Sequence, residues 1–472
     1  MEFQAIILCG PGKGLEPLVS PLLPKALLPI ANKPMLYYAL EWCQRAGLSS
    51  VVVVCSSGAE QPISKYITLG YNSMQTSKSM KVEVVARDGE TGSIVKALKD
   101  KIKLDFILLP CDFITDLPPQ TVVDIHRNQP LKTIGTGIWY KNSLDTMDKQ
   151  TLKPDLTIHT SISNPHPQLL DIYPRPKANN QLHVRMSMLW EYPQATISTS
   201  LLESSIYVFS HKALDYDFGD ADAASSISVT SEKGGVGESL KWKKPWTSVV
   251  RDIARDSWRH AKSADRDKVG IYVVPKEHSF IRCKSVSAYL EANRLILKQS
   301  SYTLPPTTAT ANGAAIGRDS LVGIGTVMEE KTSVKRSIVG ADCIFGRECR
   351  LSGCVVMDGV VLGDGVHLDN CIIGNGVIIE DKARLVGCTV EGRYVVRKAT
   401  QSKNEILRGY SAEGLLDTSD EYEDEGNEGS DEDEDEDEDE EEDDDDEVDE
   451  NDLVESEGEG IDVDDDDLFD RS

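Results

Sequence analysis

A strict repeat of 17 residues near the carboxyl end most restricts how this chain can fold. Apolar residues recur there in three series, and the members of each series are 17 positions apart. The series are Val322, Val339, Val356, Ile373, Val390; Met328, Phe345, Leu362, Ile379, Val396; and Val334, Leu351, Leu368, Leu385. Within one copy they follow at steps of 6, 6 and 5 residues. This period predicts a triangular parallel β-helix, in which each of three short sides turns one apolar residue inward.

The corners of such a coil need residues that tolerate a tight or left-handed backbone. Gly323, Gly340 and Gly374 each follow the first apolar position of their copy. Five coils stacked at ~4.8 Å would make a rod of roughly 24 Å. A fourth series with the same period is Ser337, Cys354, Cys371 and Cys388. No histidine ligands accompany these cysteines, so we interpret them as core residues and not as metal ligands.

The first 300 residues alternate strand and helix patterns. "FQAIIL" and "SVVVVCSS" are short β-branched runs typical of a buried parallel sheet, and "KPMLYYALEWCQRAGL" between them predicts a helix. The order predicts an α/β domain of Rossmann-like, doubly wound type over residues 1–303, with its ligand crevice at the carboxyl ends of the strands. Residues 219–245 are rich in Ser and Gly and predict a mobile insertion. The β-helix would follow over 304–402.

The acidity of the chain is confined to its end. Residues 420–472 hold 35 of the 79 acidic residues and one of the 50 basic residues, which leaves 49 basic and 44 acidic residues in 1–419. Residues 403–472 therefore predict a disordered acidic tail, which either only solvates the chain or docks on a Lys-rich partner. No signal peptide or membrane helix is recognisable, and the ten cysteines form no CxxC pair. These features favour a cytosolic protein with free thiols.

The amino-terminal segment resembles a known family. "AIILCGPGKGLEPLVSPLLPKALLPIANKPMLYYALEW" resembles the opening motif of sugar-nucleotide nucleotidyltransferases, and "DFILLPCDFITD" and "SSIYVFS" resemble two of their strands. The resemblance covers about residues 1 to 400 and implies a nucleotidyltransferase-type domain followed by a left-handed hexapeptide β-helix. Within this superfamily, "LPKALLPIANKPML" and "SAYLEANR" most closely resemble the gamma-subunit family of the guanine-nucleotide exchange factor for eukaryotic translation initiation factor 2.

The resemblance also places a nucleotide site at the glycine loop, where this chain departs from the family. The loop, residues 9 to 17, is one residue shorter than the family pattern, and Pro11 removes a backbone N–H donor from the phosphate cradle. No Arg precedes Leu15, and Glu16 adds a charge like that of phosphate. We interpret Gly10, Gly12 and Lys25 as vestigial nucleotide-loop positions.

Asp112, after the strand "FILLPC", stands at the family's metal position, which we interpret as vestigial too. From the residues alone, Asp112 could instead cap the next segment, and Lys25 could be an exposed turn lysine. Two further positions depart from the pattern: "GETGS" at 89–93 replaces the base-contacting turn, and Ser204 with Ser205 replaces a glycine-containing pair. Together these departures predict no catalytic residues, no cofactor and no metal.

The resemblance implies a non-catalytic subunit of the exchange complex. It would pair with the homologous epsilon subunit and serve, with the other exchange-complex subunits, in GDP/GTP exchange on translation initiation factor 2, with no direct nucleic acid and no membrane as partner. Epsilon carries a further helical domain, which we do not recognise here after residue 400. Two alternatives stay open: an active Mg²⁺-dependent sugar-1-phosphate nucleotidyltransferase that uses Asp112 and Lys25, and a subunit that binds a nucleotide or sugar nucleotide without reacting.

Overall fold

The computed structural model describes residues 3–72, 80–142, 154–174, 182, 184–216, 242–259, 266–300 and 314–409. All of these residues belong to one compact unit, Met1–Tyr410. The predicted acidic tail beyond residue 409 and residues 219–241 of the predicted insertion lie outside the described residues.

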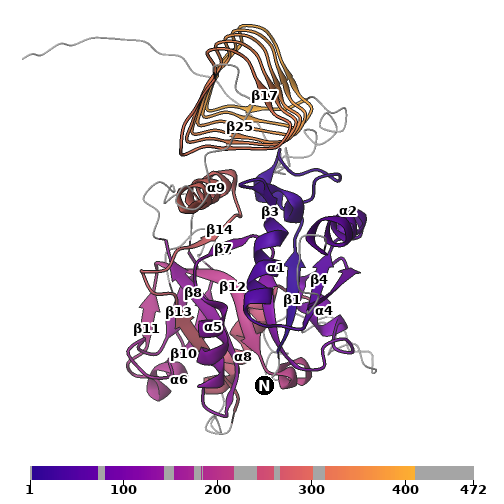
Figure 1. Cartoon of the computed structure of the whole chain (residues 1–472). Helices are drawn as coiled ribbons and strands as arrows, with labels where there is room; N and C mark the ends of the chain where they lie inside the picture. Colours follow the sequence, from indigo (N-terminus) through magenta and orange to yellow (C-terminus); the bar gives the residue numbers. More distant parts are fainter. Residues whose placement is uncertain are drawn as a thin grey trace, which may run out of the picture. The chain divides into compact units, whose positions relative to one another are not determined.

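A ten-stranded sheet organises the amino-terminal part of the chain (Figure 1). In spatial order its strands are β11 (Thr196–Ser198), β9 (Leu156–His159), β10 (Gln168–Tyr173), β13 (Lys268–Val273), β8 (Thr133–Lys141), β12 (Leu201–Phe209), β6 (Asp105–Pro110), β1 (Phe3–Cys9), β4 (Ser50–Cys55) and β5 (Lys81–Ala86). The strands β6, β1, β4 and β5 run parallel, and β12 is antiparallel to both β6 and β8. This is the predicted nucleotidyltransferase-type α/β sheet.

Helices cover both faces of this sheet, which explains why its central strands are apolar on both sides. Residues of α1 (Met35–Arg45), α2 (Glu60–Lys65) and α5 (Pro119–Arg127) share one buried cluster with alternate strand residues such as Ile7. Residues of α4 (Thr91–Ala97) and α8 (Trp246–Arg259) share the cluster on the other face, with Ile6. The small helix α6 (Met186–Glu191) packs beside β9 and β10.

The carboxyl-terminal part is the predicted parallel β-helix. Its three sheets pair each residue with the residue 17 positions later, for example Phe345 with Leu362. The sheets are the β16 sheet (β16 Leu321–Val322, β19 Ile338–Val339, β22 Val355–Val356, β25 Ile372–Ile373, β28 Thr389–Val390, β31 Ile406–Leu407), the β17 sheet (β17 Val327–Met328, β20 Ile344–Phe345, β23 Val361–Leu362, β26 Ile378–Ile379, β29 Val395–Val396) and the β18 sheet (β15 Ala315–Ile316, β18 Ser333–Lys335, β21 Arg350–Ser352, β24 His367–Asp369, β27 Arg384–Val386, β30 Gln401–Lys403).

All three apolar series of the sequence repeat lie in one buried core, together with the cysteines of the fourth series. The glycines predicted at the corners play a different part from the one expected. At Gly323, Gly340 and Gly374 an added Cβ would lie within about 2.6 Å of backbone in the next coil, so these positions are needed for close stacking and not for a left-handed backbone. At this corner the left-handed residues stand two positions later, at Gly325, Asp342, Gly359, Gly376 and Arg393.

The helix α9 (Val286–Ser300) joins the two parts of this unit. Its Tyr289 and Ala292 share an apolar cluster with Val355 and Ile372 of the β16 sheet. The predicted domain boundary at 303/304 falls between α9 and β15, outside the described residues. At the other end the coil continues to Leu407, five residues beyond the predicted end at 402.

Candidate functional site

The glycine loop follows β1 at the carboxyl edge of the sheet, where the resemblance places the nucleotide. Gly12 has a left-handed backbone (φ 81°), and Gly14 lies in a short 3-10 helix, Lys13–Leu15. An added Cβ at Gly14 would lie 2.2 Å from the carbonyl oxygen of Lys284, and one at Gly12 would lie 3.0 Å from Cβ of Lys25. These two glycines are therefore needed for contacts within the chain itself. Gly10 has nothing within 4 Å of the same position.

A pocket of about 320 Å³ opens beside this loop, but its lining is unsuited to phosphate. The residues that line it are Cys9, Gly10, Pro11, Val19, Ser20, Pro21, Pro24, Ala26, Ser56, Gly58, Ala59 and Ile63. None of them carries a charge. A triphosphate needs fixed cations and a row of backbone N–H donors, and the three prolines here donate none.

The carboxylate of Asp112 is engaged by two cations. Asp112 is separated from the end of β6 by Cys111 and is 1% exposed. Its Oδ2 accepts a hydrogen bond from Nζ of Lys25 at 2.5 Å, and its Oδ1 lies 2.7 Å from both Nε and Nη2 of Arg282. Arg282 ends the short strand β14 (Phe280–Arg282), which pairs with β7 (Phe113–Thr115), and its Nη1 donates to the carbonyl of Ser204. The side chain of Lys25 is 12% exposed, so it is not an exposed turn lysine.

The carboxylate of Asp112 and the cations of Arg282 and Lys25 stabilise one another in their ionised forms. Burial alone would raise the pKa of the Asp112 carboxyl, but Arg282 and Lys25 lower it to about 2. Burial alone would lower the pKa of the Arg282 guanidinium, but the negative charge of Asp112 has the larger effect, and the pKa is raised. A divalent cation would have to displace one of these side chains and leave its charge buried without a partner, so the residues present do not fit Mg²⁺. No group of acidic, His or Cys side chains that could hold a metal occurs elsewhere in the described ranges.

The turn at residues 89–93, which stands where the family has its base-contacting turn, is covered by Trp242 and Lys244. The N–H of Gly92 donates to the carbonyl of Lys244 at 3.0 Å, and Oγ of Ser93 donates to the carbonyl of Trp242 at 3.1 Å. An added Cβ at Gly92 would lie 2.6 Å from the first of these oxygens. Trp242 is 2% exposed. At the end of the predicted insertion, Trp242 is thus packed in the core and Lys244 is held by its backbone.

Ser204 and Ser205, which replace a glycine-containing pair, have a strained backbone and local hydrogen bonds. Ser205 has φ 55°, in the left-handed region that glycine favours. The hydroxyl of Ser204 donates to the carbonyl of Ile138 at 2.7 Å, and that of Ser205 donates to Glu203. A pocket of about 260 Å³ lies beside this segment, with Glu203, Arg282 and Lys284 in its lining.

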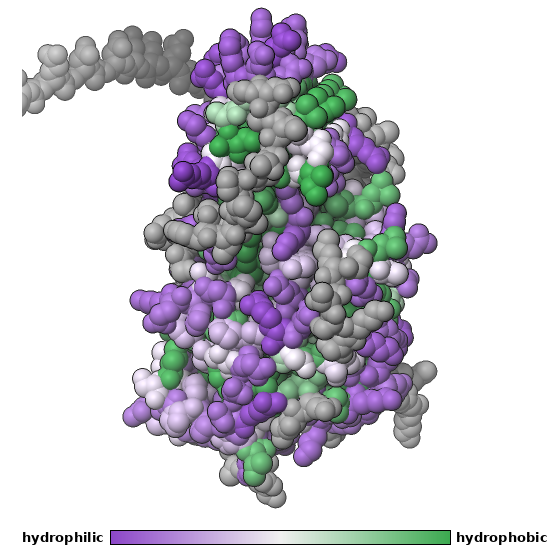
Figure 2. Space-filling model, viewed as in Figure 1, coloured by the Kyte–Doolittle hydropathy of each residue, from purple (hydrophilic) through white to green (hydrophobic). Residues whose placement is uncertain are grey.

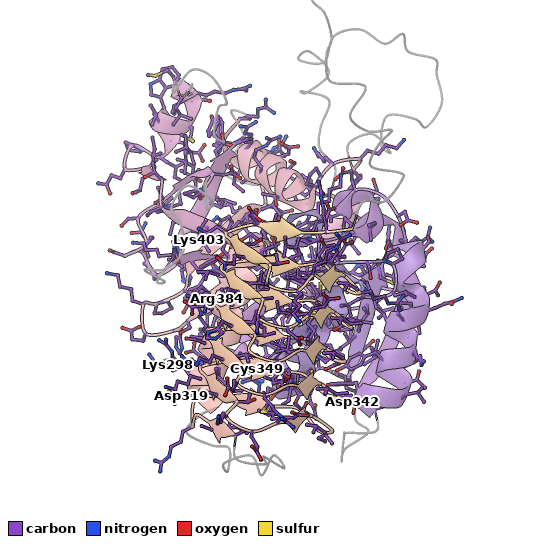
Figure 3. The ribbon with its side chains drawn as sticks, turned by 90° about the horizontal axis from the view of Figure 1, so that it is seen from above. Lys298, Asp319, Asp342, Cys349, Arg384 and Lys403 are labelled. Carbon is purple, nitrogen blue, oxygen red and sulfur yellow. The ribbon has the colours of Figure 1, made fainter. Side chains whose placement is uncertain are left out.

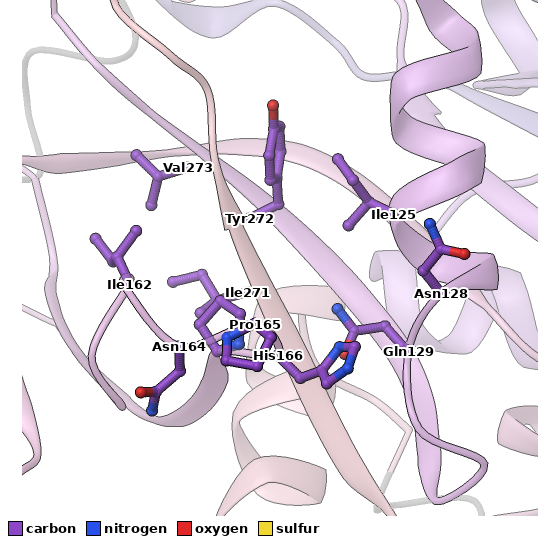
Figure 4. A pocket seen from close by; sticks show the side chains of 11 residues that line it. Ile125, Asn128, Gln129, Ile162, Asn164, Pro165, His166, Ile271, Tyr272 and Val273 are labelled. Atoms are coloured by element: carbon purple, nitrogen blue, oxygen red, sulfur yellow. The ribbon is translucent and has the colours of Figure 1, made fainter.

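A second pocket of about 320 Å³ lies on another part of the sheet (Figure 4). It is lined by Ile125, Asn128, Gln129, Ile162, Asn164, Pro165, His166, Pro167, Ile271, Tyr272 and Val273. The strand in its wall, β13, is four places from β1 in the sheet order. None of the predicted site residues lines this pocket, and no sequence motif indicated it.

Two family models match the chain. Residues 4–147 match a model described as "Nucleotidyl transferase", and residues 299–401 match one described as "EIF2B subunit epsilon LbH domain", in which LbH stands for left-handed β-helix.

Curated relatives match over a longer range. "Translation initiation factor eIF2B subunit gamma" of Schizosaccharomyces pombe is 28% identical over 348 residues, which is 71% of this chain and 74% of the relative. The eIF2B subunit gamma of Dictyostelium discoideum is 24% identical over 72% of this chain and 88% of the relative. The chain is a relative of the eIF2B gamma subunits. The eIF2B subunit epsilon of Dictyostelium discoideum is 25% identical over 42% of this chain and 29% of the relative.

These matches to eIF2B gamma subunits confirm the resemblance predicted from the opening motif and the repeat. The left-handed β-helix after a nucleotidyltransferase-type sheet is confirmed with it. Sequence reasoning found Asp112 and Lys25 but missed Arg282, which lies 170 residues from Asp112 along the chain. The only sequence signal for Arg282 is one charged residue within the apolar run "FIRC". No helix in the described ranges is long and apolar enough to cross a membrane.

Proposed function

We propose that this chain is a non-catalytic subunit of the guanine-nucleotide exchange complex for translation initiation factor 2 and that it pairs in the cytosol with the homologous epsilon subunit. The relation to eIF2B gamma subunits supports the complex. One observation carries the non-catalytic role: both oxygens of Asp112 are engaged by Arg282 and Lys25.

Nucleotidyl transfer needs a carboxylate that binds a metal and cationic side chains that contact phosphate, and in this cluster groups of both kinds are paired with each other. A sugar-phosphate oxygen attacks the α-phosphorus of a nucleoside triphosphate, and pyrophosphate leaves with the bonding electron pair. A carboxylate-bound Mg²⁺ and cationic side chains must stabilise the charge that develops on the phosphates. Here Lys25 and Arg282 engage both carboxylate oxygens of Asp112, so a metal would have to displace one of them, and the Lys25 ammonium is paired with a carboxylate.

The contribution to exchange is one of positioning. A complex accelerates GDP release when it binds the nucleotide-free state of the factor more tightly than the GDP-bound state. A subunit without catalytic groups contributes by holding its homologue in place and by extending the surface that binds the factor.

Two measurements test this proposal. Affinity capture of the tagged full chain from its own cytosol, followed by mass spectrometry, should recover an epsilon-type homologue, and the initiation factor at low salt. Purified chain incubated with nucleoside triphosphates, sugar 1-phosphates and Mg²⁺ should release no pyrophosphate above the level of Asp112→Asn. Release that this substitution abolishes would establish the alternative enzyme, and capture of no homologue would refute the proposed assembly.

A further inference from the structure

Three free cysteines lie side by side at the carboxyl edge of the ten-stranded sheet. Cys55 ends β4, Cys9 ends β1, and Cys111 comes directly after β6. Cys9 is the register partner of Cys55, and on its other side the N–H of Cys111 donates to the carbonyl of Leu8 at 3.1 Å. All three side chains belong to the apolar cluster on one face of the sheet, so they form a row across three adjacent strands. We call them the thiol row.

Two members of the thiol row contact each other. The side chains of Cys9 and Cys111 are joined by a hydrogen bond. The thiol of Cys55 instead donates to the carbonyl of Val85, in the strand on the other side, at 4.0 Å. Adjacent strands lie about 4.8 Å apart, within the range of about 4.4–6.8 Å that separates the Cα atoms of a disulfide. Cys9 and Cys111 are therefore placed to form a disulfide, and Cys55 is turned away from them.

Only one thiol of this pair opens to the outside. Cys9 is half-buried and lines the uncharged pocket of about 320 Å³ beside the glycine loop. Cys111 is 1% exposed and does not line it. A water molecule takes up about 30 Å³ in the liquid, so the pocket has room for a molecule several times larger. On the face shown in Figure 2, apolar side chains form only small separate groups among hydrophilic ones. Such a small uncharged opening favours a small uncharged reactant over a macromolecule.

A second hydrogen-bonded pair of thiols, in the β-helix, has the same contact without the access. Cys354 and Cys371 stand 17 positions apart in successive coils and are joined by a side-chain hydrogen bond. They are 1% and 0% exposed and lie in the core of the coil. Cys349, labelled in Figure 3, belongs to the same core and donates to the carbonyl of Gly363 at 3.1 Å. These thiols are packing residues, because the folded coil shields them from a reactant.

The surroundings of the thiol row disfavour a metal ion as its ligand. Zinc sites take three or four ligands that converge on one point, and the thiol of Cys55 is directed elsewhere. The cation of Lys25 would also repel a metal ion. Its charge has the opposite effect on a thiolate: the hydrogen bond from Cys9 lowers the pKa of the Cys111 thiol, and Lys25 lowers it further against the effect of burial. The pair is thus suited to thiol chemistry.

We propose that Cys9 and Cys111 form an oxidation-sensitive dithiol, which a hydroperoxide entering the pocket converts to a disulfide. The sulfur of Cys9 attacks one peroxide oxygen and the O–O bond breaks. The leaving oxygen takes the electron pair and a proton, which gives a sulfenic acid at Cys9 and an alcohol, or water from hydrogen peroxide. The sulfur of Cys111 then attacks the sulfur of Cys9, and the hydroxyl group leaves as water with the second thiol proton. The two thiols lose two electrons, which the O–O bond accepts.

The disulfide would act on the glycine loop and on the buried ion pairs beside it. Cys9 begins the loop, and Cys111 precedes Asp112, whose carboxylate binds Lys25 and Arg282. A bond between the two sulfurs ties β1 to β6 and closes a long loop of chain, so the oxidised form should unfold at higher urea than the reduced form. An excess of small thiols reverses the reaction, as is usual for redox-sensing disulfides in a reducing compartment. None of these steps depends on the proposed function.

The test treats purified full-length chain with hydrogen peroxide at pH 7, blocks the remaining thiols by alkylation and digests the chain with trypsin without reduction. The three cysteines of the row fall in separate tryptic peptides, residues 1–13, 46–65 and 104–127. Mass spectrometry should show a species that joins 1–13 to 104–127, at least tenfold above its level in untreated chain, and dithiothreitol should remove it. Cys354 and Cys371 share one peptide, 351–382, which should keep both thiols alkylated and is the internal control.

Two variants assign the roles within the row. Cys111→Ser should lose the joined species, and the sulfenic acid at Cys9 should then be trapped by dimedone. Cys55→Ser is the matched control and should leave the joined species unchanged.

The wild-type chain alone decides the result if a variant does not fold. A species that joins 1–13 to 46–65 would assign the disulfide to Cys9 and Cys55 and overturn the proposed pair. The absence of any joined species would overturn the proposal, and so would oxidation of Cys354 and Cys371 as fast as that of Cys9, because access through the pocket would then not select the thiol.

Discussion

Replacing Asp112 by Asn distinguishes a buried ion-pair role from a catalytic one. The substitution keeps the shape of the side chain but leaves the cations of Arg282 and Lys25 without an anion, at a site where Asp112 is 1% exposed. Breaking a buried pair in this way costs about 3–5 kcal/mol of the free energy of unfolding. The lowered pKa of Asp112 gives an independent figure: a change from 3.8 to about 2 corresponds to about 2 kcal/mol at 1.36 kcal/mol for each pKa unit.

The measurement is urea-induced unfolding at pH 7, followed by tryptophan fluorescence. We expect Asp112→Asn to lose at least 2 kcal/mol of unfolding free energy. Asp124→Asn is the matched control, because Asp124 pairs with Arg127 at 3.5 Å with a side chain that is 59% exposed. Such exposed pairs contribute less than about 1 kcal/mol.

A double-mutant cycle isolates the pair itself. Arg282→Met together with Asp112→Asn should lose less than the sum of the two single losses, because the double variant no longer leaves one of the two charges uncompensated. An Asp112→Asn variant as stable as the wild type, or more stable, would refute the ion-pair argument. That result is typical of a catalytic carboxylate, whose removal relieves strain at an active site.

Three further outcomes follow from the same contacts. Folding lowers the pKa of Asp112, so the stabilisation that its carboxylate provides is present above about pH 4 and is lost as the pH falls towards 2. The difference in urea midpoint between wild type and Asp112→Asn should therefore shrink over that range. Gly14→Ala should destabilise the chain by about 2 kcal/mol or more in the same assay, because its Cβ would overlap the carbonyl of Lys284, whereas Gly10→Ala should change stability by less than about 0.5 kcal/mol. Phe345→Ala, in the β-helix core, should cost about 3–5 kcal/mol, and a melt of that part of the chain at the wild-type temperature would contradict the core assignment.

The sequence alone was sufficient for the β-helix because its signal is local and periodic. A residue that points inward on one coil is stacked on residues 17 positions away on both sides, so an apolar residue at an inward position favours apolar residues at the same position of the next coils. Val334, Leu351, Leu368 and Leu385 therefore predict one another, and all lie in the core. The glycine loop was recognisable for a similar reason, since its strand, turn and following helix are consecutive in the chain.

Two features depended on the tertiary structure. The partners of Asp112 are Lys25 and Arg282, 87 and 170 residues away, and no spacing rule connects them. The sequence indicated that the loop departs from the family, but not that the carboxylate had acquired two cations. The outward faces of the β-helix are similar, because the 17-residue period determines which residues face inward and not which outward column another element covers. Only the return of α9 onto the β16 sheet shows that Val355 and Ile372 are covered while Ile344 and Ile378 of the β17 sheet are exposed. The 17-residue period determines the coil, whereas packing between distant segments decides which outer faces of the coil are exposed and which charged side chains form buried ion pairs.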